Sequence, residues 1–405
     1  MLLKSLSLQN YRCFEKLTID LADRINLFLG DNGSGKSAIL DAIAAGLGTV
    51  ATHLPEVSGL SIKGDDLRLV DGVQEPFVRV ALENNEDIIW DITRRRDKSK
   101  KTAAQVPRGR GKKQVAAYLD AQVIDPYNES KAFALPFFAY YGVSRAILDI
   151  PMRRRGFSKR SSRFEALVGA LNADSRFKSA FVWFYNKENE EARLQKEKRS
   201  FDITLKELDV VRRALATVFP DLSDPHIQVR PLRFMVKKDG QPLSLHQLSD
   251  GYKTMLGLIL DLSSRMAMAN PDLDNPLASE ALVMIDEVDL HLHPRWQQRI
   301  LGDLLKTFPN TQFFLTTHSP FIVESLNNHL KRHTVNRRAI NDPEITKIEP
   351  LPPGKAHAFL LKDARMHDIM DKELGLVDDK LIAYFNEINS IYDRMRDIEW
   401  DMRHD

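Results

Sequence analysis

The stretch from residue 25 to residue 40, INLFLGDNGSGKSAIL, constrains the fold most, because an apolar run passes through a glycine-rich turn into a helix. Its spacing matches G-x-x-x-x-G-K-S. Such glycines let successive backbone N–H groups point inward, and the helix that follows adds the positive end of its dipole. We therefore predict a phosphate-binding loop formed by Gly30, Asp31, Asn32, Gly33, Ser34, Gly35, Lys36 and Ser37.

Two side chains of this loop carry the predicted chemistry. Lys36 is suited to neutralise the β- and γ-phosphates of ATP, and the Ser37 hydroxyl is suited to ligate Mg²⁺. A glycine-rich turn without a ligand is the alternative, but the strand before it and the amphipathic helix at residues 38–43 supply the context that the motif requires. ATP and Mg²⁺ are the cofactors that this motif predicts.

Length and composition limit the classes of protein to which the chain can belong. With 405 residues and 43% hydrophobic content, the chain can bury one large core with an added lobe, or two domains. Apolar runs stay well below the roughly 18 residues of a membrane span, and no signal-peptide pattern is seen, so we expect a soluble, cytoplasmic protein without a membrane partner. Cys13 is the only cysteine, which excludes an intrachain disulfide and a thiolate metal cluster.

Two apolar strands end in polar residues that suit phosphate chemistry. The strand at residues 281–285 is followed by Asp286 and Glu287, and unpaired carboxylates at the end of a core strand are costly unless a metal or a catalytic water uses them. We predict that Asp286 holds Mg²⁺ through water and that Glu287 polarises the attacking water. The strand at residues 311–317 ends in His318, for which we favour a γ-phosphate-sensing role over a simple polar cap.

A third motif, LSDGYK, precedes the apolar helix at residues 255–266. Ser249 and Gly251 place a hydroxyl, backbone N–H groups and a helix dipole at one point, which suits an anion, although an ordinary helix cap is the alternative. His291 and His293 have a spacing that could suggest a metal site, but the sequence offers no third ligand nearby.

Two segments are strongly basic. Residues 94–113 contain ten Lys and Arg and one acid, and residues 153–163 contain six Lys and Arg and no acid. We expect the first segment to be an exposed loop, and we leave open whether both are solvated surface or contact nucleic acid through counterion release. Between them, residues 134–141 read as a buried strand.

The other elements follow from periodicity. Residues 2–14 and 16–21 predict a β-meander whose turn carries Arg12 and Phe14, which either face the nucleotide or have ordinary surface and core roles. Residues 77–83 and 87–93 predict a strand pair, and residues 164–219 predict a helical lobe. Strand character returns at 227–236 and 242–245, and residues 344–351 are expected to close the sheet.

Together, and in this order, the motifs resemble those of the ATP-binding-cassette ATPases of the RecF/SMC type, over residues 1–50 and 245–325. AYYGVSR at 139–145, LSDGYK and IDEVDLHLHP are similar to the bacterial defence-island ATPases such as PtuA of the Septu system. The resemblance implies an α/β P-loop ATPase head with a mixed sheet, an inserted helical lobe and a helical tail. It also implies that Ser249 and Gly251 contact the ATP of an opposite subunit, that Asp289 faces the dimer and that His318 is the switch histidine.

This resemblance divides the chain into an ATPase head, an inserted lobe and a tail. Residues 1–145 and 241–351 would form the two halves of the ATPase head, 146–240 the inserted lobe and 352–405 an acidic tail. The signature has Asp250 where the family commonly has glycine, and the strand at 134–141 is not followed by the usual magnesium-sensing glutamine. The second of these departures concerns the magnesium shell.

The tail has an apolar stripe at helical spacing. It packs on the chain's own lobe or forms a partner surface, and the resemblance implies that the partner could be a nuclease. The stripe consists of Leu381, Phe385, Ile388, Tyr392, Met395 and Met402.

The predicted function is an ATPase that forms a dimer or larger oligomer around ATP and regulates an effector in phage defence. A RecF-like DNA-repair ATPase and an ATP-gated scaffold with little turnover are the alternatives.

Overall fold

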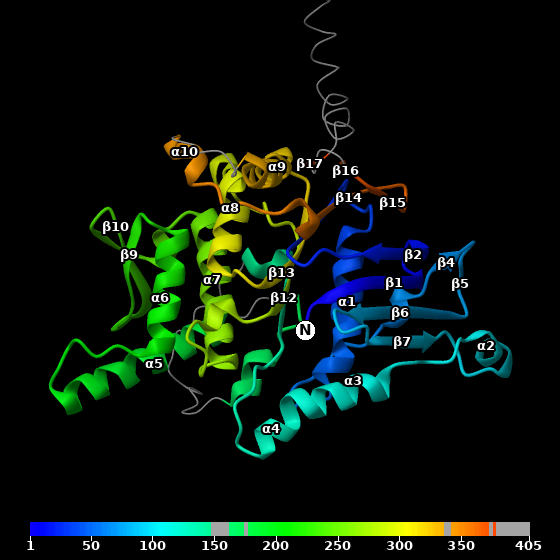
Figure 1. Cartoon of the computed structure of the whole chain (residues 1–405), viewed down its shortest axis with the longest axis horizontal. Helices are drawn as coiled ribbons and strands as arrows, with labels where there is room; N and C mark the ends of the chain where they lie inside the picture. Colours follow the sequence, from blue (N-terminus) through cyan, green and yellow to red (C-terminus); the bar gives the residue numbers. More distant parts are fainter. Residues whose placement is uncertain (147–161, 174–176, 336–341, 372–375, 378–405) are drawn as a thin grey trace, which may run out of the picture.

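The computed structural model describes residues 1–146, 162–173, 177–335, 342–371 and 376–377 (Figure 1). A six-stranded sheet forms its centre, in the order β15-β14-β3-β13-β12-β8. Its strands are β3 (Ile25–Gly30), β8 (Phe137–Tyr141), β12 (Ala281–Ile285), β13 (Thr311–Thr317), β14 (Ala356–Lys362) and β15 (Arg365–Asp368). All pair in parallel except β15, so this is the mixed α/β sheet that the sequence predicts.

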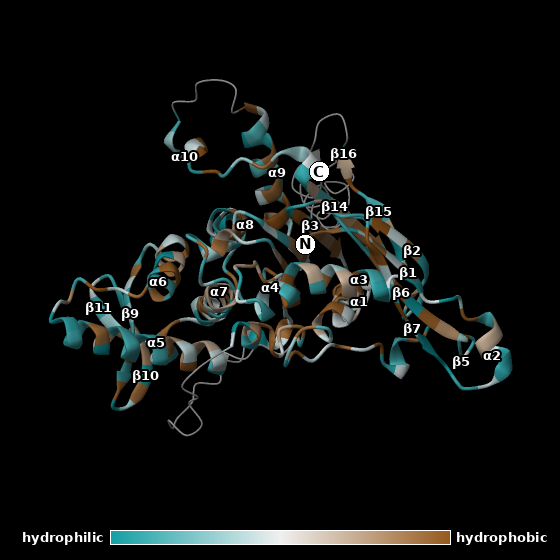
Figure 2. Cartoon of the chain, turned by 60° about the horizontal axis from the view of Figure 1, so that its bottom comes forward, coloured by the Kyte–Doolittle hydropathy of each residue, from teal (hydrophilic) through white to brown (hydrophobic). Residues whose placement is uncertain are grey.

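The four middle strands are apolar for a physical reason. Every residue of β3, β8, β12 and β13 is buried, as expected for a parallel sheet that is covered on both faces. Figure 2 shows hydrophobic segments in the middle of the molecule around β3. Because parallel strands end at the same edge, the residues that follow Gly30, Tyr141, Ile285 and Thr317 meet there.

A second sheet covers the first helix. Its antiparallel order is β2-β1-β6-β7, with β1 (Leu3–Tyr11), β2 (Phe14–Asp20), β6 (Phe77–Asn84) and β7 (Ile89–Arg95). Helix α1 (Lys36–Ala51) packs on it, and the buried Trp90 donates from Nε1 to the Gly46 carbonyl at 3.0 Å. The predicted pairing of the first two strands and the predicted strand pair are confirmed, but the meander is not, because β3 pairs with β13 and β14 in the central sheet. The small hairpin β4 (Leu69–Val70) and β5 (Val73–Gln74) lies between them in sequence.

The prediction that residues 94–113 form an exposed loop is wrong in part. The segment contains α2 (Lys100–Gln105) and the start of α3 (Lys112–Leu119). Helix α2 is stabilised locally, because the Ser99 side chain accepts a hydrogen bond from the Thr102 N–H at 3.1 Å. Buried Leu119 anchors α3. A π-helical turn (Asp120–Ile124) and α4 (Asp125–Asn128) then lead toward β8.

The lobe lies at the left of Figure 1 and combines helices with a small sheet. Helices α5 (Phe177–Lys198) and α6 (Lys206–Val218) accompany the antiparallel strands β9 (Leu222–Val229), β10 (Leu232–Lys238) and β11 (Gln241–Ser244). Helix α7 (Asp250–Ala269) packs on α5 and α6. It is tied to the central sheet through Asp261 Oδ2, which accepts from Tyr141 at 2.9 Å and from Arg265 at 2.8 Å.

Helices α8 (Pro294–Thr307) and α9 (Pro320–Val335) follow β12 and β13 and pack on each other. The prediction that residues 344–351 close the sheet is wrong. Pro343–Thr346 form the short helix α10, because Asp342 caps it through the Glu344 N–H at 2.8 Å. Strand β14 takes the place beside β3, with Phe359 stacked on Phe28 at 5.6 Å.

The short strands β16 (Met370–Asp371) and β17 (Leu376–Val377) follow β15. The predicted apolar stripe at residues 381–402 lies outside the described residues. Among the helices that the structure describes, none has the length and apolar character needed to cross a membrane.

Candidate ATP-binding site

The loop between β3 and α1 curls around the side chain of Lys36. This lysine is 5% exposed, and its Nζ donates to the carbonyl oxygens of Gly30 at 2.8 Å and Asp31 at 2.9 Å. Gly35 has φ 102°, and a Cβ there would lie 2.8 Å from both Cys13 Sγ and the Phe14 ring. Burial lowers the pKa of Lys36, while the nearby Asp286 carboxylate favours its charged form. The loop therefore holds a buried cation at the start of a helix, which suits a phosphate.

Asp286 joins this loop to the neighbouring strands. Its Oδ2 accepts a hydrogen bond from Ser37 Oγ at 2.8 Å, and its Oδ1 accepts one from Thr316 Oγ1 at 2.5 Å. A hydroxyl and a carboxylate side by side are oxygen ligands of the kind that Mg²⁺ prefers, and this ion usually keeps several waters. Ser37 and Asp286 thus fit the predicted magnesium site. Thr316 was missed by the sequence reasoning, although a polar residue inside a buried strand is a usable signal.

Glu287 directly follows Asp286 and has an unusual backbone. Its φ is 47°, and its N–H donates to Thr316 Oγ1 at 2.7 Å. The carboxylate is 32% exposed, and its Oε1 lies 3.9 Å from Nε2 of His318. That nitrogen is buried without a hydrogen-bond partner among the described residues. The structure therefore brings the proposed base and the proposed switch histidine together.

The loop after β12 carries Asp289 and lies against the signature. Asp289 Oδ1 accepts a hydrogen bond from Thr317 Oγ1. Ser249 is the exposed N-cap residue of α7, and a Cβ on Gly251 would lie 2.9 Å from the His291 carbonyl oxygen. His293 caps α8 by accepting from the Arg295 N–H at 3.3 Å. The signature thus contacts the loop that carries Asp289, and His293 has a structural role.

Arg12 lies in the turn that packs on the phosphate loop. It donates from Nη1 to Asp41 Oδ2 at 2.7 Å and from Nε to Asp66 Oδ1 at 2.9 Å. Asp41 also accepts from the Tyr140 hydroxyl at 2.9 Å. Since Asp41 lies one helical turn after Ser37, this ion-pair cluster borders the site, and any contact of Arg12 with nucleotide would have to compete with two carboxylates.

The two basic segments differ in how many of their cations the structure describes and in what those side chains contact. All ten Lys and Arg of residues 94–113 are exposed. Of the six basic residues in the second segment, the structure describes Arg163 alone, and the nucleic-acid prediction for this segment stays a prediction. The guanidinium of Arg163 stacks on Phe133 at 4.0 Å and donates to the carbonyls of Ala269 at 2.8 Å and Phe133 at 2.9 Å. These contacts make Arg163 a structural link between α7 and the approach to β8.

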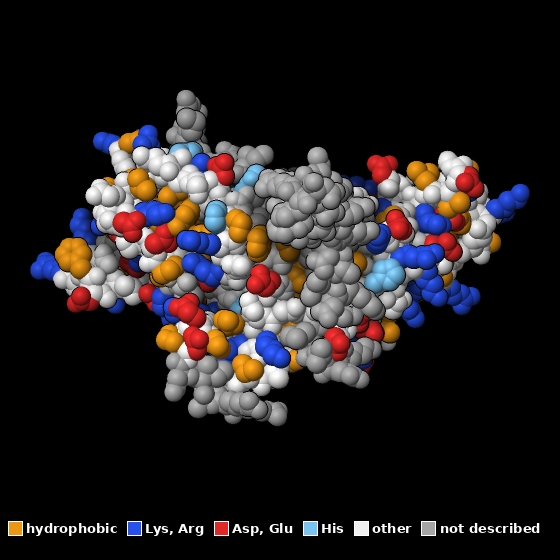
Figure 3. Space-filling model, turned by 90° about the horizontal axis from the view of Figure 1, so that it is seen from above, with side chains coloured by type: hydrophobic (Ala, Val, Ile, Leu, Met, Phe, Trp, Pro, Cys, Tyr) orange, Lys and Arg blue, Asp and Glu red, His pale blue; other side chains and the backbone are white. Residues whose placement is uncertain are grey.

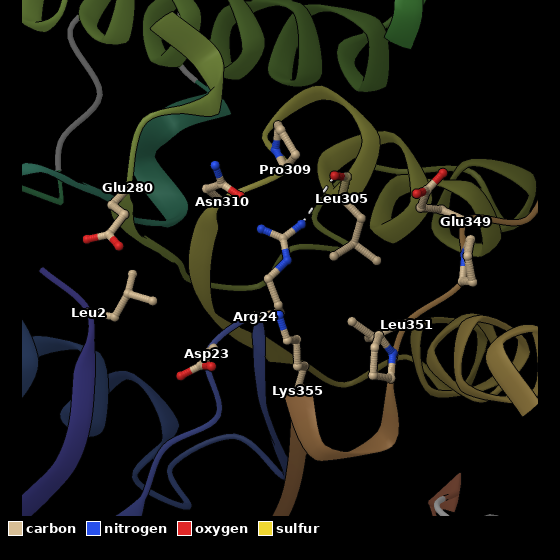
Figure 4. Close-up of a pocket in the computed structure, with 12 residues that line it drawn as sticks. Leu2, Asp23, Arg24, Glu280, Leu305, Pro309, Asn310, Glu349, Leu351 and Lys355 are labelled. Atoms are coloured by element: carbon tan, nitrogen blue, oxygen red, sulfur yellow. Dashed lines mark hydrogen bonds between the residues drawn. The ribbon is translucent and has the colours of Figure 1, made fainter. Parts of the chain in front are cut away.

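A pocket of about 430 Å³ lies at the other edge of the central sheet, where its parallel strands begin (Figure 4). Arg24 projects into it beside Leu305, and its Nη1 and Nη2 donate to the carbonyls of Thr311 at 2.8 Å and Leu305 at 3.2 Å. Burial lowers the pKa of Arg24 to about 10. These donors stabilise the end of α8, and the pocket lies at the edge of the sheet opposite to the phosphate loop.

The fold, together with the phosphate loop and the carboxylates at the carboxyl edge of the sheet, defines a P-loop ATPase of the ATP-binding-cassette type. The chain belongs to the AAA-domain family, since a family model described as an AAA domain matches residues 5–209. A second model, described as an AAA ATPase domain, matches residues 159–323.

Relatives agree with this assignment. "Retron Vc95 probable ATPase" of Vibrio cholerae serotype O1 biovar El Tor is 28% identical over 375 residues, which cover 80% of this chain and 71% of the relative. "Retron Ec83 probable ATPase" of Escherichia coli is 29% identical over 378 residues, 79% of this chain and 69% of the relative. Septu protein PtuA of Bacillus mycoides (strain KBAB4) is 42% identical over 82 residues, 20% of this chain and 11% of that protein. The predicted resemblance to this group of ATPases is confirmed.

Proposed function

We propose that this protein hydrolyses ATP to ADP and phosphate. The observation that carries the proposal is the hydrogen-bonded set Ser37–Asp286–Thr316 beside the buried ammonium of Lys36. Mg²⁺, when bound, neutralises charge on the β- and γ-phosphates, and Ser37 and Asp286 are the residues that would hold it. Lys36 supplies a second positive charge beside this set.

Glu287 is the group proposed to take a proton from the attacking water. Its carboxylate is part-exposed and follows the buried Asp286, so one carboxylate faces the metal and the other remains free to act as a base. His318 supports this arrangement, because its Nε2 has no hydrogen-bond partner among the described residues and lies 3.9 Å from Oε1 of Glu287, where it could contact a γ-phosphate. The pair would couple the position of the base to the presence of the terminal phosphate.

Two copies are proposed to share each ATP. Ser249 is exposed at the start of the 20-residue helix α7, where backbone N–H groups and the helix dipole favour an anion. Its helix contacts the loop of Asp289, the residue that the resemblance places at the dimer face. In such a sandwich, Ser249 and Gly251 of one copy complete the site that Lys36 forms in the other.

The relatives favour a role in anti-phage defence, in which the ATPase regulates an effector. We propose a nuclease effector that binds the acidic tail, whose stripe lies beyond the described residues. The ten cations of residues 94–113, here called the basic surface, are proposed to contact nucleic acid. Figure 3 shows Lys and Arg side chains projecting at that end of the molecule, at the right of the view.

The test compares two variants with the unaltered protein. Glu287→Gln should keep ATP binding and lose turnover by roughly 10²–10⁴-fold, since that is the usual contribution of a general base. Lys36→Ala should weaken ATP binding itself. ATP affinity from equilibrium titration and phosphate release at saturating ATP separate the two effects. Near-normal hydrolysis by Glu287→Gln would overturn the assignment of the base.

The same measurements address the alternatives. An ATP-gated scaffold would bind ATP and release almost no phosphate, with or without nucleic acid. A RecF-like repair ATPase would share the site but act on gapped or broken DNA, and it would lack a toxic effector encoded beside it. Genetic neighbourhood and DNA-structure dependence of turnover therefore distinguish repair from defence.

A further inference from the structure

The guanidinium of Arg145 lies behind the backbone of the two acidic residues at the site. Arg145 is 2% exposed and lies in the 3-10 helix (Val143–Ala146) that follows β8. Its Nη1 donates to the carbonyl oxygens of Asp286 and, at 3.0 Å, Gly142. Its Nη2 donates to the carbonyl oxygen of Glu287. One fork-shaped side chain therefore binds two consecutive peptide groups of the loop after β12.

These contacts act on a backbone that needs support. The φ of 47° at Glu287 is a left-handed conformation that non-glycine residues rarely adopt. Thr316 Oγ1 accepts from the N–H of Glu287 at 2.7 Å, and Arg145 binds the carbonyl of the same residue. Held at both ends, the residue directs its carboxylate toward His318 rather than along an extended strand.

The charge of Arg145 is suited to this place. Burial lowers its pKa to about 10, and the carboxylates of Asp286, Asp289 and Glu287 favour the charged form, so the group is cationic at neutral pH. A guanidinium has donors only and cannot ligate a metal cation. Arg145 thus does not substitute for a magnesium-sensing glutamine after this strand, and any effect on catalysis passes through the backbone of Asp286 and Glu287.

We propose that Arg145 is a positioning residue for ATP hydrolysis, which holds the Asp286–Glu287 backbone so that the Glu287 carboxylate stands at the attacking water. This inference rests on the proposed function. It predicts a specific pattern: loss of Arg145 lowers kcat and leaves the Michaelis constant for ATP nearly unchanged, because Lys36 and Ser37 still bind the nucleotide.

The experiment uses the full chain with Arg145→Lys and Arg145→Met. Lysine keeps the charge but cannot bind two carbonyls with one planar fork. We expect kcat to fall about 10-fold or more with lysine and further with methionine, while the KM for ATP changes by less than about 3-fold. Arg265→Lys is the matched control, because Arg265 is also buried and paired but contacts Asp261 and the Ala166 carbonyl instead. It should keep its kcat. If the methionine variant does not fold, the lysine variant carries the test.

A double variant makes the test sharper. If Arg145 acts only through the base, Glu287→Gln with Arg145→Lys should be no slower than Glu287→Gln alone, within about 2-fold. If the two substitutions each lower kcat by their full single-variant factor in the double variant, the proposal is overturned. A normal kcat in Arg145→Lys would also overturn it, as would a loss of ATP affinity equal to the loss of turnover. An unaltered protein without Mg²⁺-dependent turnover would instead overturn the proposed function, so the two failures are distinguishable.

Discussion

The hydroxyl of Ser37 donates a 2.8 Å hydrogen bond to Oδ2 of Asp286, although 249 positions separate the two residues in the chain. The parallel order β3-β13-β12 brings the ends of these strands to one edge, and Thr316 from the middle strand binds the other carboxylate oxygen at 2.5 Å. Both oxygens of Asp286 therefore accept hydrogen bonds from hydroxyls, which hold the carboxylate beside the phosphate loop.

The first prediction concerns the metal. Asp286→Asn should raise the Mg²⁺ concentration for half-maximal ATP turnover by roughly 10–100-fold, the usual cost of losing a group that acts on the metal through water. The measurement is a Mg²⁺ titration of phosphate release at fixed ATP. Glu280→Gln is the control, since Glu280 lies at the opposite edge of the sheet and pairs with the N-terminal amine. An unchanged Mg²⁺ requirement in Asp286→Asn would remove Asp286 from the metal site.

The second prediction concerns the shared site. Ser249→Arg places a bulky cation at the start of α7 and leaves Lys36, Asp286 and Glu287 of each copy intact. The variant should bind ATP and hydrolyse it poorly. Mixed with Lys36→Ala, it should recover part of the activity, because a mixed dimer has one site with both defects and one with neither. Phosphate release after subunit exchange measures the recovery, and a normal rate for Ser249→Arg alone would contradict the two-copy mechanism.

The third prediction concerns the basic surface. Arg94 and Arg96 donate to the backbone carbonyls of Ile62 and Gln74, so replacing them would also remove contacts within the fold. The test variant therefore replaces Lys98, Lys100 and Lys101 with Glu. Binding to DNA or RNA should weaken, and the slope of log affinity against log salt should fall by up to about 3 in magnitude, near 0.9 for each lost phosphate contact.

The control for this charge reversal carries the same change in net charge at the other end of the molecule. It reverses the exposed cations Lys196, Lys198 and Arg199, at the end of α5 and just after it. Binding should fall only in the variant of the basic surface, and ATP turnover without nucleic acid should change in neither. Equal salt slopes for the two variants would make residues 94–113 ordinary solvated surface.

The fourth prediction concerns stability in acid. His329 of α9 is buried, and its Nδ1 lies 2.6 Å from the Glu349 carbonyl oxygen. Burial lowers the pKa of His329 below its ordinary value of 6.5, so the unfolded chain takes up a proton before the folded protein does. The contribution of neutral His329 to the free energy of unfolding is complete above pH 6.5, and it is lost as the pH falls through the lower pKa of the folded state.

The measurement for His329 is the change in denaturation midpoint between neutral pH and about pH 5, a range that brackets the ordinary pKa of histidine. His329→Gln should lower stability at neutral pH and lose less on acidification than the unaltered protein. The same substitution at the exposed His246 should leave the pH response unchanged. An equal acid response in His329→Gln would assign the loss of stability to other groups.

The sequence by itself determined the parts that depend on local spacing. The phosphate loop, the buried strands β3, β12 and β13, and the carboxylates after β12 follow from glycine spacing, from apolar runs and from polar residues at strand ends. These signals lie within about ten residues and need no knowledge of neighbours. The ATPase class and the fold class were therefore within reach of sequence reasoning.

Only the tertiary structure decided which distant groups meet. Arg145 and the backbone of Asp286 are 141 positions apart, and their contact depends on β8 lying beside β12. Arg163 looked like part of a basic cluster until its contacts with Phe133 and Ala269 were seen. Strand β14, and not residues 344–351, pairs with β3. Strand order depends on contacts between segments that are distant in sequence, and hydrophobic periodicity carries no information about such contacts.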